Sequence, residues 1–125
     1  MNENEISKVI FDFSLKIHRT LGPGLLESAY ESCLYYELHK AGFTVSQQKP
    51  LPLVYEDVKL EAGYRVDLLV ENSVIIEVKS VDKLAPVHFA QVLTYLKFSN
   101  CKLGILVNFN EFLLKDGFKR VVNKL

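Results

Sequence analysis

The N-terminal part of the chain has the hydrophobic spacing of two helices. Over residues 5–20, apolar side chains recur three or four positions apart, at Ile6, Val9, Ile10, Phe13 and Ile17. The sequence LGPG that follows ends this helix, because Gly22 suits a helix C-terminus and Pro23 cannot continue the hydrogen-bond pattern. A second helix is predicted over about residues 25–41.

After the second helix the hydrophobic spacing changes to two. Residues 43–57 predict two short strands, the second of which is interrupted by Pro50 and Pro52, residues that suit the edge of a sheet. Apolar side chains then occupy every even position from 58 to 70: Val58, Leu60, Ala62, Tyr64, Val66, Leu68 and Val70. This alternation predicts one long strand with a fully apolar face.

The rest of the chain predicts a returning strand, a helix and a further strand. After a turn at residues 71–73, alternate apolar residues continue to Val78. Pro86 is expected to begin a helix that reaches about Phe98. The apolar run 102–109 indicates a central or parallel strand, and residues 113–125 a short basic helix. The order ααββββαβ(α) predicts a single α/β domain over residues 1–125, with helices packed on a sheet.

The hairpin at 64–80 carries four charges within its apolar sequence. If the hairpin centres on Asn72, Asp67 lies opposite Glu77, and Arg65 lies opposite Lys79. These side chains would share the face opposite Val66, Leu68, Ile76 and Val78. Like charges directly across a ladder repel, so the pairing is unfavourable by itself.

Two arrangements would resolve this repulsion. Diagonal ion pairs would make the four residues an exposed charge ladder, which the spacing alone favours. A divalent cation between Asp67 and Glu77 would instead create a binding site, since Mg²⁺ prefers carboxylate oxygens together with water and phosphate. Lys79 would then stand beside the metal, placed to contact a phosphate or orient the attacking water.

Composition fits a globular protein with no global attraction to nucleic acid. The 125 residues are 49% hydrophobic and carry no formal net charge. Residues 1–62 have a net charge of minus three and residues 63–125 of plus three, so only the second half offers a local basic face. Cys33 and Cys101 form no disulfide framework or zinc motif, and the N-terminus is polar, so we expect a cytoplasmic protein without a membrane span.

Several motifs together resemble a known family. Asp67, nine intervening residues and then Glu77-Val78-Lys79 resemble the PD-(D/E)xK nuclease superfamily, although Val66 stands where that motif has proline. The sequence GLLESAY at 24–30 is similar to the pattern that names the GxxExxY proteins of that superfamily. The segments LGPGLLESAYE, YRVDLLVEN, VIIEVKS, QVLTYLK and LKDGFKRVVN extend the resemblance over nearly the whole chain.

The resemblance implies a restriction-endonuclease-like fold, a mixed sheet flanked by helices, and assigns catalytic roles. Asp67 and Glu77 would bind the metal, Glu27 would assist through metal or water, and Lys79 would act on the water or the developing charge. Gln91 and Tyr95, on the helix after the Glu-x-Lys strand, would shape the site.

Two further residues have an open assignment. Tyr30 follows Glu27 by one helical turn, so it either faces the same cleft or is a core aromatic. Arg65 either neutralises a phosphate near the metal or pairs with Glu61 or Asp67.

We therefore expect a nuclease that hydrolyses phosphodiester bonds, with DNA as substrate and Mg²⁺ or Mn²⁺ as cofactor. One alternative is a catalytically inactive module of the same fold that binds nucleic acid or protein. Another is a structural, dimerising domain whose hairpin charges form ion pairs. A homodimer is compatible with the nuclease, because a small nuclease often needs two sites to cut two strands.

Overall fold

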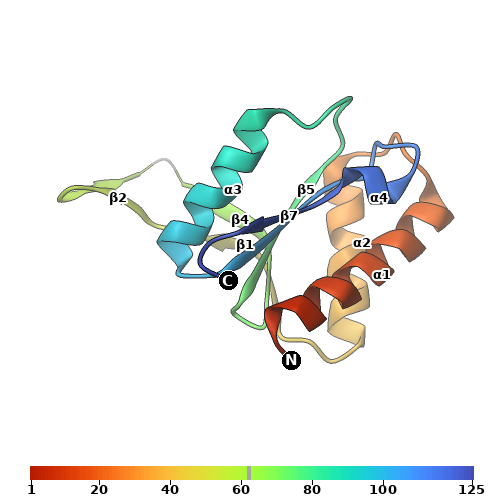
Figure 1. Cartoon of the computed structure of the whole chain (residues 1–125), viewed down its shortest axis with the longest axis horizontal. Helices are drawn as coiled ribbons and strands as arrows, with labels where there is room; N and C mark the ends of the chain where they lie inside the picture. Colours follow the sequence, from red (N-terminus) through yellow and green to blue (C-terminus); the bar gives the residue numbers. More distant parts are fainter. Residues whose placement is uncertain (62) are drawn as a thin grey trace.

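The computed structural model describes residues 1–61 and 63–125, and it confirms a mixed α/β architecture (Figure 1). A five-stranded sheet has the strand order β1-β4-β5-β6-β7, and β2 and β3 form a separate pair. In chain order the elements are α1 (Glu3–Leu21), α2 (Glu27–Lys40), β1 (Val45–Pro50), β2 (Leu53–Tyr55), β3 (Val58–Leu60), β4 (Arg65–Val70), β5 (Val74–Lys79), α3 (Pro86–Ser99), β6 (Leu103–Asn108), α4 (Leu114–Gly117) and β7 (Phe118–Val122).

Helices cover both faces of the sheet (Figure 1). On one face α1 and α2 pack through residues such as Ile10 and Leu34 against a core cluster that includes Ile76. On the other face α3 packs through Val92 and Leu96 on a second cluster. Alternate residues of a strand point to opposite faces, and strands covered on both sides are therefore apolar at nearly every position. None of the described helices is long and apolar enough to cross a membrane.

The β5-α3-β6 unit confirms the prediction of a parallel strand. β6 pairs parallel to β5 and antiparallel to β7, and all six of its residues are buried. The helix lies close to the sheet at Gly104, where an added Cβ would be 2.5 Å from Val92 Cγ1. This connection places the start of α3 at the end of β5 that carries Glu77 and Lys79.

The hairpin of β4 and β5 has the predicted register near its turn. Leu68 pairs with Ile76, and Val70 with Val74. The expected face of Val66 is wrong, because this side chain packs in the second cluster rather than with Leu68. Near Val66 the β1–β4 pairing lacks the pair of Gln48 with Asp67, although the register is the same on both sides, and Gln48 has a φ of 52°.

The prediction of one long strand from 58 to 70 is also wrong. β3 belongs to the separate two-stranded pair, and the chain returns to the five-stranded sheet only at β4. β2 and β3 form an antiparallel arm that projects from the molecule, and Val58 on it is 59% exposed (Figure 1). Gly63 has a φ of 71°, a conformation that redirects the backbone and that glycine adopts readily. Ala62, part of the predicted apolar face, lies outside the described residues.

The C-terminal segment is not the predicted basic helix. Only Leu114–Gly117 is helical, and Phe118–Val122 forms the edge strand β7. This strand pairs with β6, where Leu106 lies opposite Lys119. The hydrogen bonds available along β6 outweigh the weak helical preference of a short charged segment.

Candidate functional site

The strands β4 and β5 stop pairing regularly at the residues that carry the carboxylates. Beyond the pair of Leu68 and Ile76, backbone N–H groups donate to side-chain carboxylates of the opposite strand instead of to backbone carbonyls. The Asp67 N–H donates to Glu77 Oε2 (2.8 Å), and the Val78 N–H donates to Asp67 Oδ2 (2.9 Å). Each carboxylate therefore bonds the backbone of the opposite strand, so both are held next to each other at the open end of the hairpin.

Burial makes this pair of carboxylates electrostatically unfavourable. Glu77 is only 4% exposed, and desolvation, reinforced by the negative charge of Asp67, raises its pKa to about 8. Burial, together with the charge of Glu31, also raises the pKa of Asp67. The backbone hydrogen bonds oppose these increases without cancelling them. A cation bound here would remove the repulsion.

Lys79 lies near the carboxylates without forming an ion pair with them. Its positive charge acts against the raised pKa of both Asp67 and Glu77, and the side chain is half-buried. Throughout residues 1–61 and 63–125, the one salt bridge within 4.0 Å joins Lys16 to Glu37. The diagonal ion pairs of a charge ladder are therefore not formed, and the ammonium group of Lys79 is available to another anion.

Glu27 joins the start of α2 to the segment that follows Lys79. It is the first residue of α2, and its Oε2 accepts a hydrogen bond from the Ser80 N–H (3.1 Å). The Ser80 hydroxyl donates to the Leu25 carbonyl (2.7 Å). These two contacts hold the end of β5 against the start of α2. They therefore also fix the backbone next to Lys79.

Glu31 and Gln48, which the sequence interpretation missed, complete the acidic side of the site. The Gln48 Nε2 donates to Glu31 Oε1 (2.8 Å) and to Asp67 Oδ1 (3.2 Å), so one amide bridges two carboxylates. Both residues line an open cavity of about 720 Å³ together with Glu27, Asp67 and Ser80. Glu31 follows Glu27 by four residues, a spacing that puts both on one helix face and would have indicated it.

The helix α3 brings Tyr95 toward the carboxylates from the face of the sheet opposite α2. Tyr95 is 4% exposed, and burial followed by the charge of Glu77 raises its pKa. Its ring contacts that of Tyr64 edge-on, with centroids 6.4 Å apart. Gln91 lies one turn earlier and is half-buried, and among the described residues it forms no hydrogen bond with Lys79.

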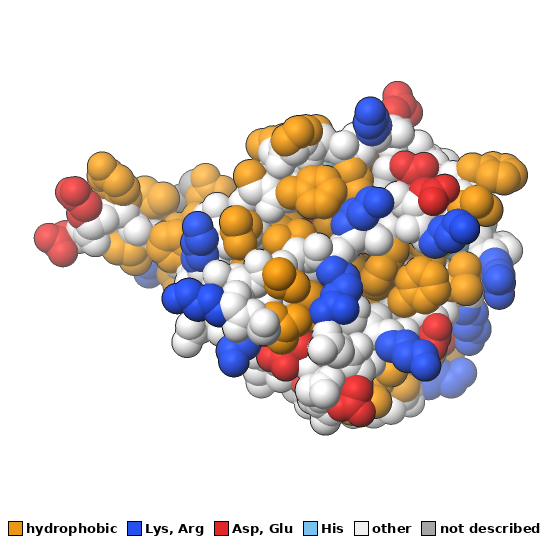
Figure 2. Space-filling model, viewed as in Figure 1, with side chains coloured by type: hydrophobic (Ala, Val, Ile, Leu, Met, Phe, Trp, Pro, Cys, Tyr) orange, Lys and Arg blue, Asp and Glu red, His pale blue; other side chains and the backbone are white. Residues whose placement is uncertain are grey.

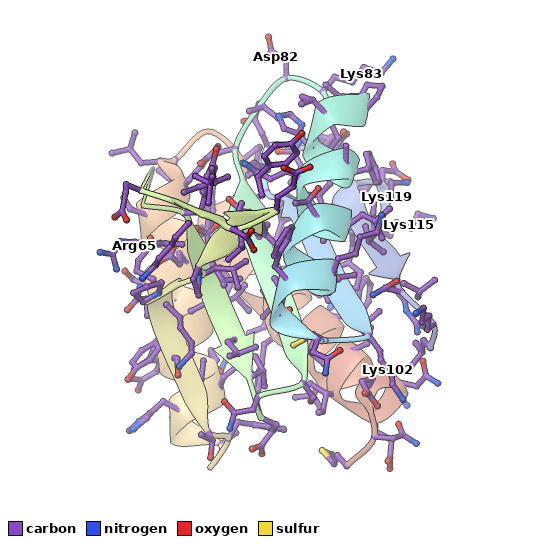
Figure 3. All side chains as sticks on the ribbon, turned by 90° about the vertical axis from the view of Figure 1, so that its left-hand side faces the viewer. Arg65, Asp82, Lys83, Lys102, Lys115 and Lys119 are labelled. Atoms are coloured by element: carbon purple, nitrogen blue, oxygen red, sulfur yellow. The ribbon has the colours of Figure 1, made fainter. Side chains whose placement is uncertain are left out.

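Tyr30 and Arg65 do not face the carboxylates. Tyr30 is fully buried, stacks on Phe109, and donates its hydroxyl to the Gly22 carbonyl (2.6 Å), so contact with a substrate is excluded and its role is to support the turn before α2. Arg65 donates to the Gln48 carbonyl and points away from α3 (Figure 3). In the described chain it pairs with neither Glu61 nor Asp67.

The donors present fit a divalent cation held by two carboxylates. Within the described ranges no three acidic, histidine or cysteine side chains are close enough to form a ligand group, so Glu27, Asp67 and Glu77 are not assembled as a set of three. Asp67 and Glu77 are adjacent, and one hydrogen bond occupies Oε2 of Glu77, whereas no described residue bonds its Oε1, which is left for a ligand. Mg²⁺ in proteins is commonly bound by one or two carboxylates, with water and phosphate completing its coordination.

Comparison with known proteins gives one family. A family model described as the PD-(D/E)XK nuclease superfamily matches residues 4–121. Neither the curated proteins nor the solved structures contain a significant match.

Proposed function

Because the chain belongs to the PD-(D/E)XK nuclease superfamily, we propose that it hydrolyses phosphodiester bonds in DNA with Mg²⁺ as cofactor. The observation that supports this most is the buried pair of Asp67 and Glu77, held together by each other's backbone against their repulsion. An arrangement that destabilises the free protein is typical of a functional site, because the ligand supplies the missing interaction.

Asp67 and Glu77 would hold the metal in this proposal. When bound, a divalent cation supplies a Lewis acid for the phosphate oxygens and lowers the pKa of the attacking water. The cavity lined by Glu27, Glu31 and Asp67 is open to solvent, so water and a phosphate group can reach the carboxylates from that side.

Lys79 would stabilise the negative charge that develops on the phosphate. It follows Glu77 by two residues on β5, so both side chains leave the same strand toward one face. Among the described residues Lys79 forms no ion pair, so its ammonium group can act on the substrate. Glu27, bonded to the Ser80 N–H, would fix the backbone at this position.

The test is cleavage of a labelled duplex by Glu77→Gln and Lys79→Ala. We expect the unchanged protein to cut with Mg²⁺ and to be inactive with EDTA, and each variant to be slower by roughly 10²-fold or more. Glu71→Gln and Lys8→Ala remove the same charges from exposed positions and are expected to cut normally.

Thermal unfolding of all four variants shows whether a slow variant is folded. Wild-type cleavage by both Glu77→Gln and Lys79→Ala would contradict the proposed site. Binding of nucleic acid without cleavage under Mg²⁺ or Mn²⁺ would instead support the inactive binding module.

A further inference from the structure

Charge is strongly segregated in this neutral protein. From residue 83 to the C-terminus there are seven basic residues against two acidic ones, Glu111 and Asp116, a formal net charge of plus five. Residues 83–110, which include α3 and β6, contain no acidic residue. Because α3 contacts both β6 and β7, the lysines of this region that lie on the α3 side of the sheet form one basic face, whereas Arg120 lies on the other side.

The basic face follows α3 along its length. Figure 3 shows Lys83, Lys119 and Lys102 in succession along the helix, on the side away from Arg65, and all three side chains are exposed. Lys115 is on α4, which packs with α1 on the other side of the sheet. Figure 2 shows lysine and arginine side chains around α3 and β7, and acidic side chains at the tip of the arm. The 14 residues of α3 span about 21 Å at ~1.5 Å per residue, so these charges are spread linearly.

The register of the sheet connects this face to the carboxylates. Glu77 pairs with Leu106, and Leu106 pairs with Lys119, so the three residues form one row across β5, β6 and β7. Adjacent strands are ~4.8 Å apart, which puts the backbone of Lys119 about 10 Å from that of Glu77. The next residue, Arg120, bonds Asn4 of α1 on the opposite face of the sheet, so Lys119 is on the face of α3.

Three lysines converge at the far end of α3. Lys97, Lys102 and Lys124 line a cavity of about 320 Å³ together with Asn100 and Asn123. The Asn123 N–H donates to the Lys102 carbonyl (2.9 Å) and so fixes the C-terminal segment there. A lysine in the last turn of a helix compensates the helix dipole, which accounts for Lys97 but not for a lysine brought from the chain terminus.

We infer that this basic face, formed by Lys83, Lys97, Lys102, Lys119 and Lys124, binds the phosphate backbone of a nucleic acid strand that runs along α3 from the carboxylates to the lysine cavity. The assignment of this strand as the one that is cut rests on the proposed function. A linear polyanion fits because the charges extend along the helix, whereas a single small phosphate would need only the cavity. Figure 3 shows Asp82 beside Lys83 at one end of the face.

The spacing of the sheet sets the position of the anchored phosphate. Glu77 is three residues from Val74, which pairs with Leu103, the neighbour of Lys102. Lys102 is one residue further and one strand across, so at ~3.3 Å per strand residue and ~4.8 Å between strands its backbone is about 14 Å from that of Glu77. This corresponds to roughly four nucleotides at ~3.4 Å each along one strand of a duplex.

The test is binding of a fluorescent 16-mer, single-stranded or duplex, in EDTA at several salt concentrations. We expect the triple variant Lys97→Gln, Lys102→Gln, Lys124→Gln to bind at least tenfold more weakly. For each phosphate that is no longer neutralised, the slope of log affinity against log salt should shrink by roughly 0.9 on the duplex and roughly 0.7 on the single strand. The matched control is Lys8→Gln, Lys16→Gln, Lys40→Gln, which removes the same charge from exposed residues of α1 and α2 and is expected to bind like the unchanged protein.

Each outcome separates the basic face from the active site. Equal affinity of the two triple variants would overturn the basic face, even if the protein cuts DNA. Selective weakening in a protein that never cuts would support the face and contradict the nuclease. Vesicles containing an anionic phospholipid provide a further arm: if the Lys97 triple variant loses vesicle binding but retains the oligonucleotide, the face binds membranes and the inference is wrong.

Discussion

Near its turn, the β4–β5 hairpin is closed by apolar pairs such as Leu69 with Ile75, whereas at its open end Asp67 and Glu77 lie where the next pairs would be. In the first half both faces are covered by helices, and the side chains of β5 are almost fully buried. In the second half carboxylates bond the backbone of the opposite strand. The same two strands thus contain a region that stabilises the fold and a region that opposes it.

The difference shows how the fold holds two carboxylates together. A fully buried aliphatic side chain contributes ~1.5–3 kcal/mol through the hydrophobic effect. The apolar half therefore supplies the free energy that keeps a buried, repulsive pair in place a few residues away. Changes in the two halves should then have opposite effects on stability and on activity.

The largest effect on stability is expected from the apolar half. Ile75 is fully buried against α3, and Ile75→Ala removes aliphatic contacts and leaves a cavity. We expect the free energy of unfolding to fall by about 3 kcal/mol and the melting temperature by roughly 10 °C. Cleavage per folded molecule should be nearly unchanged at low temperature. Thermal unfolding by circular dichroism measures the loss, and a decrease of less than about 1 kcal/mol would contradict the contrast between the halves.

The apolar half was predictable from sequence because its information is local. Alternation with period two and a polar turn at residues 71–73 gave the register that pairs Leu68 with Ile76. The same alternation failed for 58–70, because a repeat of two also fits an arm whose apolar side chains are exposed, such as Val58. Periodicity gives the faces of a strand, but it does not show whether another element covers them.

The charged half was only partly predictable because its contacts come from distant segments. The spacing of Asp67, Glu77 and Lys79 lies within one hairpin, and the structure brings these residues together. Gln48 reaches Asp67 from β1 through a backbone with φ of 52°, which no local pattern indicates. The strand β7 was missed for a similar reason, since its pairing with β6 outweighs its own sequence preference.

The next effect in size concerns Glu77 and has the opposite sign. Glu77→Gln keeps an acceptor for the Asp67 N–H and removes a buried carboxyl group that must take up a proton or hold an unfavourable charge on folding, so we expect higher stability with lost cleavage. Because the pKa of Glu77 in the folded protein is about 8, above the ordinary 4.5, this residue destabilises the fold progressively as the pH rises from 4.5 to 8.

The gain from Glu77→Gln should therefore be negligible below pH 4.5 and on the order of 2 kcal/mol at pH 7 in EDTA. Urea unfolding of both proteins across this pH range measures it. A loss of stability at pH 7, or a gain that does not depend on pH, would contradict the repulsion of the two carboxylates. Mg²⁺ is expected to stabilise the unchanged protein and to have little effect on the variant.

The smallest expected effect is that of Gln48→Ala, at the edge of the charged half. The Gln48 amide bonds both Glu31 and Asp67, whereas the amide of Gln47 bonds Glu31 alone, so Gln47→Ala is the matched control. Burial raises the pKa of Asp67, and the Gln48 hydrogen bond opposes that rise. Its removal should lower the free energy of unfolding by about 1 kcal/mol at pH values where Asp67 is ionised. Cleavage should slow more in Gln48→Ala than in Gln47→Ala, since only the former releases the Asp67 carboxylate. Equal rates for the two variants would mean that the bridge to Asp67 does not position it, and that the backbone of β5 alone holds the pair.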